Sequence, residues 1–207
     1  DPEILEKARM IWSFGETRTP AQSRDYHAYA LGWMYRNNDL TAAFGRSQLT
    51  RLTEYIATQR SNAAVLLNEL KDVKGLILPT EPPNHEHNYY NFTCRIDSEL
   101  LGWRDHPAKL RDKIMKALQA EGTQVGVWQQ FILPAMTVFQ AKNAFGQGSP
   151  WCLGQPVDYN PARFPVAQKH TDSHFGMTTP LRAPNGEEQA KRVAEAIRKV
   201  FENVNDL

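Results

Sequence analysis

Apolar side chains recur with a helical period at the start of the chain. They fall on one face of a predicted helix, at Ile4, Leu5, Ala8, Ile11 and Trp12. Asp1 and Pro2 are typical of an N-cap and a first-turn proline, and Gly15 is expected to stop the helix. Because the helical rhythm begins with the first residue and no methionine precedes it, we expect the chain to begin partway through a larger fold.

A second and much longer helix is predicted from Asn38 or Asp39, either of which can cap it, to about Asp72. Its apolar positions are Leu40, Ala43, Phe44, Leu49, Leu52, Ile56, Ala63, Leu66, Leu67 and Leu70. At 1.5 Å per residue it would be ~50 Å long, more than a small domain needs. We therefore expect it to bend at Gly45 or to bridge two domains. The polar segment before it, residues 16–29, is expected to be a loop.

The remaining sequence predicts a small mixed domain. Short strands are expected at 76–78, 87–97 and 124–128, and helices at 108–120 and 186–204, whereas the Pro-, Gly- and aromatic-rich residues 129–184 read as irregular. The last helix is expected to place Ala190, Val193, Ile197, Val200 and Val204 on the face that packs against the core. Three strands with helices on one face make an α+β layer. The organisation predicted is an N-terminal part at 1–40, a bridging helix at 41–72 and a small α+β domain at 73–207.

Composition narrows the classes of function without naming one. The 24 basic and 23 acidic residues give a net charge of +1, which argues against nucleic acid or an anionic membrane as a partner. The two cysteines, Cys94 and Cys152, form no zinc or disulfide pattern, which favours a reducing, cytoplasmic setting. No apolar run approaches the ~20 residues that a membrane helix requires.

The segment that leads into the long helix, GWMYRNNDLTAAFGRSQLTRLTEYIATQR, carries the most specific pattern. It resembles the sugar aminotransferases of the DegT family, which are fold type I enzymes that use pyridoxal phosphate. The matching positions are Gly32, Tyr35, Arg36, Asp39, Ala42, Ala43, Gln48, Leu49, Leu52 and Arg60. The fold class that the resemblance implies is α/β, with this chain as the C-terminal part of such a transferase.

The resemblance also implies the reaction. Family members pass an amino group from an amino acid, commonly glutamate or glutamine, through pyridoxal phosphate to a keto sugar or a sugar-like acid. It places the lysine that holds the cofactor upstream of Asp1, so that these 207 residues contain no catalytic residue and are expected to be inactive alone. Lys142, which precedes glycines, is better read as a surface lysine because it lies on the wrong side of the long helix.

Cofactor-binding residues are expected in the loop before the long helix. In this family that loop crosses the interface of a homodimer, so that its polar residues touch the cofactor phosphate of the other subunit. The resemblance implies Tyr35, Arg36 and Asn37 for this role. A guanidinium offers several fixed donors to phosphate oxygens, and a helix N-terminus behind it adds unpaired N–H groups. The alternative is that Arg36 pairs with a surface carboxylate while its neighbours pack a core.

Substrate-binding candidates lie in the small domain. Tyr90 stands where relatives often have histidine, and Trp128 with Gln129 could stack on and hydrogen-bond a sugar; either aromatic residue could instead serve packing alone. The pairs His85 with His87 and His170 with His174 have spacings compatible with a metal, but no third ligand is evident, so no metal site is predicted.

Two other functions remain open at this stage. The first is a non-catalytic binding or dimerisation module, and the second is a sugar dehydratase of the same family that uses the cofactor without the lysine. The sequence upstream of Asp1 would discriminate between them and the aminotransferase.

Overall fold

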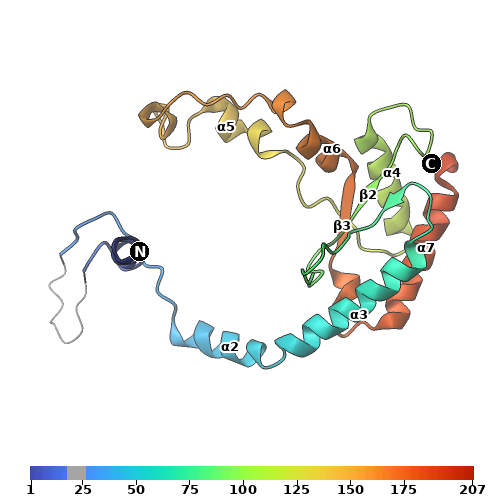
Figure 1. The fold of residues 1–207 in the computed structure, drawn as a ribbon, viewed down its shortest axis with the longest axis horizontal. Coiled ribbons are helices and arrows are strands. Elements are labelled where there is room, and N and C mark those ends of the chain that lie inside the picture. The colour runs from blue at the N-terminus through green and yellow to red at the C-terminus, as the bar shows by residue number, and fades with distance from the viewer. Residues whose placement is uncertain (18–26) are drawn as a thin grey trace. The chain divides into compact units, whose positions relative to one another are not determined.

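The computed structural model of the protein describes residues 1–17 and 27–207 (Figure 1). The chain divides into two compact units, an N-terminal unit at Asp1–Thr53 and a C-terminal unit at Glu54–Leu207. Most of the loop predicted at 16–29 lies outside the described residues. Each unit is described below by itself.

The N-terminal unit contains the two helices predicted from capping residues. Helix α1 spans Pro2–Trp12, and the Asp1 side chain accepts hydrogen bonds from the backbone N–H groups of Glu3 and Ile4. Helix α2 spans Asp39–Leu49, and the Asn38 side chain accepts from the N–H of Thr41. Both predicted caps are confirmed, because each side chain satisfies N–H groups that the first helical turn leaves unpaired.

Neither helix of this unit buries a residue. The exposed large apolar side chains on them are Ile4, Leu5, Ile11 and Trp12 on α1 and Leu40, Phe44 and Leu49 on α2. Large apolar side chains left exposed in this way are typical of a face that packs against another body.

The prediction of a single helix over 41–72 is wrong, because the structure has two helices in this region. Helix α3 spans Leu52–Leu70 and is separated from α2 at Thr50 and Arg51. The Thr50 hydroxyl donates to the carbonyl of Ser47 at 2.7 Å, and the Arg51 N–H bonds the Gln48 carbonyl three residues back. These local bonds compete with the helical ladder and interrupt it. We expected a bend at Gly45, but the interruption lies five residues later, at Thr50.

The C-terminal unit is built on a three-stranded antiparallel sheet in the order β1-β2-β3. Strand β1 spans Leu76–Ile77, β2 spans Phe92–Ile96 and β3 spans His174–Met177. The prediction of three strands is confirmed, but the position predicted for the third strand, 124–128, is wrong. Only Gly126 forms a bridge there, to Gly176 of β3. Strand β3 itself lies in the segment predicted to be irregular.

Strand β2 is also shorter than the predicted 87–97. Tyr89 has a left-handed backbone (φ 51), its N–H donates to Nδ1 of His87, and the Tyr90 N–H donates to the Asn88 side chain. Side chains that bond neighbouring backbone groups stabilise turns at the expense of a strand ladder. Residues 87–91 therefore form an irregular segment, bent at 90–91, that leads into β2.

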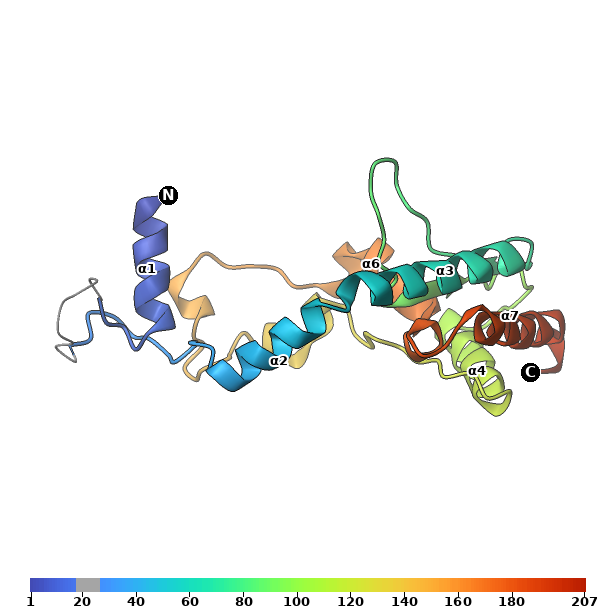
Figure 2. The same cartoon turned by 90° about the horizontal axis from the view of Figure 1, so that it is seen from below.

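Helices α3, α4 (Pro107–Ala120) and α7 (Glu187–Glu202) share one hydrophobic core with the sheet. Phe92 and Cys94 of β2 are fully buried in it, as is Phe175 of β3. Figures 1 and 2 both show α3 and α7 side by side, and Arg198 of α7 forms an ion pair with Asp72 just after α3. The predicted helices at 108–120 and 186–204 are confirmed.

The segment between Gly126 and α7 is largely made of short elements. It holds the helices α5 (Thr137–Ala141) and α6 (Pro165–Ser173) and 3-10 turns at Leu133–Ala135, Trp151–Leu153, Pro161–Arg163 and Thr179–Leu181. A further 3-10 turn at Val204–Asp206 follows α7. None of the helices in the described part of the chain has the length and apolar character that crossing a membrane demands.

Candidate active site

A hollow in the C-terminal unit lies beside α6, on the face of β2 and β3 that carries Thr93 and His174. It has a volume of about 1080 Å³. Aromatic and aliphatic side chains dominate its walls, with a few polar groups among them. The residues that line the hollow are Asn91, Thr93, Trp128, Gln129, Phe131, Ile132, Leu133, Pro134, Arg163, Phe164, Pro165, Val166, Ala167, His170, Thr171 and His174. An apolar hollow with few polar groups is the usual form of a small-molecule site.

A glycine of β3 lies against the side chain of Asn91, which lines this cavity. A Cβ on Gly176 would lie 2.4 Å from Oδ1 of Asn91, so a larger residue there would displace the end of that side chain. Gly176 and Gly126 also exchange two backbone hydrogen bonds, of 3.0 and 2.8 Å. That pairing anchors the segment leading to Trp128 at the edge of the sheet.

The structure brings together the three predicted substrate residues. The rings of Tyr90 and Trp128 meet edge to face with centroids 6.4 Å apart, and both side chains are exposed, by 55% and 69%. Gln129 lines the cavity next to Trp128. The three therefore form one rim, with polar and aromatic groups open to a ligand.

Arg182 joins this rim and was missed by sequence reasoning. Its guanidinium carbon lies 4.8 Å from the centroid of the Tyr90 ring. No sequence signal marks it, because Arg182 and Tyr90 are distant in the chain and meet only through the fold.

The stacked histidines His170 and His174 line the same cavity. Their rings lie 4.7 Å apart and nearly parallel, and Nδ1 of the buried His174 lies 3.0 Å from the carbonyl oxygen of His170. Burial, the neighbouring His174 and the charge of Arg95 lower the pKa of His170 below its ordinary value. Within the described residues no third His, Cys, Asp or Glu side chain joins such a pair in a metal-binding group.

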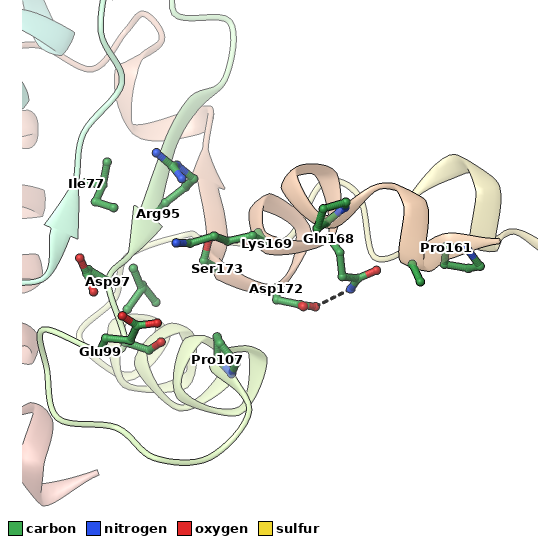
Figure 3. A pocket seen from close by; sticks show the side chains of 14 residues that line it. Ile77, Arg95, Asp97, Glu99, Pro107, Pro161, Gln168, Lys169, Asp172 and Ser173 are labelled. Carbon is green, nitrogen blue, oxygen red and sulfur yellow. Dashed lines mark hydrogen bonds between the residues drawn. The ribbon is translucent and has the colours of Figure 1, made fainter. Parts of the chain in front are cut away.

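A second cavity of about 700 Å³ lies near α6 and has a more charged lining (Figure 3). Arg95, Asp97 and Glu99 come from β2 and the turn after it, and Lys169 and Asp172 come from α6. In Figure 3 Lys169 extends toward the side that holds Asp97, while Gln168 donates to Asp172 at 2.9 Å. Its mixed charges do not single out one kind of ligand.

In the N-terminal unit the loop before α2 is held by the end of α1. The N–H groups of Trp33 and Tyr35 donate to the carbonyls of Ile11 and Trp12, and the Phe14 N–H donates to the Trp33 carbonyl. This ladder fixes the backbone that precedes Arg36.

The three predicted cofactor residues follow in this loop. The guanidinium of Arg36 lies over the Phe14 ring, 5.2 Å from its centroid, and its shielded Nε has no hydrogen-bond partner within the described structure. Tyr35 is 64% exposed and stacks on Trp33. Asn37 is exposed, and its side-chain oxygen accepts a hydrogen bond from the N–H of Asn38.

Lys142, the lysine set aside above, is the left-handed residue that ends α5 (φ 49). It is exposed and is not among the described residues that line either cavity.

The fold and the loop before α2 define the class of protein. The chain belongs to the DegT/DnrJ/EryC1/StrS aminotransferase family, which it matches over residues 1–198. The resemblance stated from the sequence is thereby confirmed.

Two curated relatives differ in the chemistry that their names give. The chain is 29% identical over 109 residues to a dTDP-4-dehydro-2,3,6-trideoxy-D-glucose 4-aminotransferase of Saccharopolyspora spinosa, covering 48% of this chain and 28% of that protein. It is 26% identical over 83 residues to a dTDP-4-dehydro-2,6-dideoxy-D-glucose 3-dehydratase of the same organism, covering 40% and 18%.

Solved structures agree on the fold. A putative sugar aminotransferase from Streptococcus pneumoniae in its PMP-form has a TM-score of 0.75 at 15% identity, over 100% of this chain and 45% of that one. A 3-amino-5-hydroxybenzoic acid synthase has a TM-score of 0.74 at 21% identity, over 98% and 48%. The fold is therefore that of the matching part of fold type I pyridoxal-phosphate aminotransferases. The chain spans about half the length of these structures, and less of the curated relatives above.

Proposed function

We propose that this chain works within a pyridoxal-phosphate-dependent aminotransferase that moves an amino group from glutamate or glutamine to a keto sugar or sugar-like acid. The observation that carries the proposal is the family match over residues 1–198, which includes the loop that presents Arg36. In this proposal residues 1–40 belong to the large domain and the interface loop, and residues 73–207 form the small domain. Residues 41–72 connect these two parts.

The loop before α2 is proposed to hold the cofactor phosphate of a partner subunit. Arg36 fits an anion, because its shielded Nε lacks a hydrogen-bond partner within the described structure and a guanidinium offers several fixed donors to phosphate oxygens. Tyr35 and Asn37 would add a hydroxyl and an amide donor beside it. When bound, pyridoxal phosphate supplies the electron sink that lets a proton leave the carbon bearing the amino group.

The substrate is proposed to bind along Tyr90, Trp128 and Gln129. Aromatic faces suit the apolar side of a sugar ring, and the Gln129 amide can both donate and accept hydrogen bonds to its hydroxyls. The neighbouring hydrophobic walls would exclude water from the reacting end of the substrate.

The exposed apolar faces of α1 and α2 support a homodimer in which the cofactor site is shared. We place the Schiff-base lysine outside these 207 residues and the enzyme in the cytoplasm. The chain alone is therefore expected to be inactive, because a transaminase needs that lysine amine to hold the cofactor and to shuttle the proton.

The test uses the natural protein that contains this chain, loaded with pyridoxal phosphate. Glutamate or glutamine should bleach the visible absorbance of the bound cofactor and release one equivalent of the matching 2-oxo acid, with the amino group retained on the cofactor. A protein that never acquires the cofactor absorbance would overturn the proposal.

A second candidate has one specific observation in its favour, the similarity to a 3-dehydratase. A dehydratase of this type would bind the cofactor in its aminated form and release water from a sugar without net transfer of nitrogen. Isotopically labelled glutamate separates the two, since only an aminotransferase moves the label into the sugar. A non-catalytic binding module would show neither cofactor absorbance nor product.

A further inference from the structure

We propose that Gln59 and Arg60, two adjacent residues of α3, are positioning residues that aim the side chain of Tyr90 at the rim of the large cavity. They act through the backbone of the irregular segment 87–91 and need no contact with a ligand. The inference rests on the proposed function for the role of Tyr90 as a substrate residue. The contacts that carry it all lie within the C-terminal unit.

Side chains from outside this segment hold its backbone groups. Nε2 of Gln59 donates to the Tyr89 carbonyl at 2.9 Å. One guanidinium nitrogen of Arg60 donates to the His87 carbonyl and forms an ion pair with Glu81 at 2.9 Å. Oε1 of Glu81 in turn accepts the His87 N–H at 2.6 Å. We call Gln59, Arg60 and Glu81 the clamp, because they satisfy three backbone groups of a segment that lies outside the sheet.

The clamp supports a backbone conformation that Tyr89 would not keep by itself. Its φ of 51 lies in the left-handed region, which is uncommon for a bulky residue. Its side chain is buried, 5% exposed, and its ring packs against Phe92 with the ring centroids 5.9 Å apart. A residue in such a conformation persists only where its surroundings over-determine it, and such residues cluster at ligand sites. The hydrogen bond from Gln59 and the burial of the ring supply that constraint here.

The conformation of Tyr89 sets the direction of Tyr90. Strand β2 begins at Phe92, three residues after Tyr89, and its pairing with β3 fixes the chain from there on. Between these fixed points the side chain of Tyr90 is 55% exposed, and its ring meets that of Trp128 edge to face. If Tyr89 relaxed to a negative φ, the peptide plane before Tyr90 would rotate and carry its ring away from Trp128. The clamp therefore keeps the two aromatic groups together before a ligand arrives, which spares the ligand the entropy of ordering them.

Fluorine NMR of the natural protein that contains this chain, labelled with a fluorinated tyrosine, reports where the Tyr90 ring lies. Tyr90→Phe assigns the resonance, and Trp128→Leu gives the shift that the ring takes without its indole neighbour. Gln59→Glu keeps the shape of the side chain but replaces the amide donor by a carboxylate, which cannot donate to the Tyr89 carbonyl. We expect it to move the Tyr90 resonance at least halfway to its position in Trp128→Leu. Arg60→Met should act in the same direction, and Arg60→Lys less, because lysine retains a donor.

The matched control is Gln189→Glu, which makes the same chemical change at an exposed position of α7 and should leave the Tyr90 resonance in place. Shifts confined to Tyr89 and Tyr90 distinguish positioning from a general loosening of the fold, which moves all tyrosine resonances together. Such a general movement, or a Tyr90 resonance that stays in place in both Gln59→Glu and Arg60→Met, overturns the inference. The measurement does not depend on cofactor chemistry. A protein that never acquires the cofactor absorbance but shows the expected shifts would overturn the proposed function and leave the clamp standing.

Discussion

Gly32 approaches Gly15 so closely that a Cβ on Gly32 would lie 2.0 Å from the Gly15 backbone nitrogen. Gly15 itself has a φ of +75, a conformation that favours glycine, and its N–H bonds the Met10 carbonyl in the last turn of α1. This contact seats the loop that carries Arg36 against the end of α1. It gives a physical reason for the glycine that opens the family pattern.

We expect Gly32→Ala to lower the free energy of unfolding of the natural protein by ~1–3 kcal/mol, because the backbones must separate to admit the methyl group. Gly45→Ala is the matched control. Nothing lies within 4 Å of its added Cβ, and alanine in a helix should stabilise by up to about 1 kcal/mol. Denaturant unfolding measures both variants. Equal effects of the two substitutions would contradict the close approach.

Asn62 is buried in α3, and Asn62→Ala should cost roughly 1–3 kcal/mol, since it leaves the carbonyls of Leu181 and Asn185 without the donors that now satisfy them. Asn68→Ala lies on the exposed face of the same helix and should stay within about 0.5 kcal/mol of wild type. Urea unfolding followed by circular dichroism compares them. A neutral Asn62→Ala would show that the chain between Leu181 and Asn185 does not depend on this side chain.

The pKa of His170 is expected below the ordinary 6.5, because partial burial, His174 and Arg95 all disfavour its protonated form. The unfolded chain then binds this proton more tightly than the folded one. This histidine should therefore destabilise the fold as the pH falls from 6.5 through the lowered folded value. Titration of its ring proton by NMR measures the midpoint. His170→Gln should flatten that part of the stability profile; a midpoint above 6.5 would contradict the sign.

The two cysteines should differ sharply in reactivity. Cys94 is fully buried and burial raises the pKa of its thiol, whereas Cys152 is exposed. A pulse of iodoacetamide on the folded protein, read by mass spectrometry, should label Cys152 and spare Cys94. In guanidinium chloride both should react. Rapid labelling of Cys94 without denaturant would mean that β2 does not lie in the core.

Sequence periodicity located α1, α4 and α7 well, because each carries one apolar stripe, and α1 also begins at a recognisable cap, Asp1. It failed for β3, whose four residues are all buried and so show no alternation, and it placed a strand around Gly126, which makes only a bridge. The break after Thr50 has no glycine or proline to announce it.

Candidate site residues could be named from the sequence where a contiguous pattern carried them, as in the Arg36 loop, and their roles stay predictions. Trp128 and Gln129 were named because in the DegT family the segment around them leads to the substrate; the structure places both at the large cavity, although the strand predicted there is only a bridge. Arg182 could not be found, because its position depends on hydrogen bonds from Asn62, which lies far away in the sequence. Such contacts are set by tertiary packing and leave no local signal.

The central claim is that Arg36 helps to hold the cofactor phosphate, and cofactor affinity tests it most directly. Titration of pyridoxal phosphate into the natural protein, followed by absorbance, should show at least a tenfold weaker affinity for Arg36→Ala, since a charge-assisted hydrogen bond contributes about 1.5–3 kcal/mol. Arg36→Lys should be intermediate and Arg104→Ala unchanged. If Arg36→Ala binds the cofactor as tightly as Arg104→Ala does, the account of this loop is wrong.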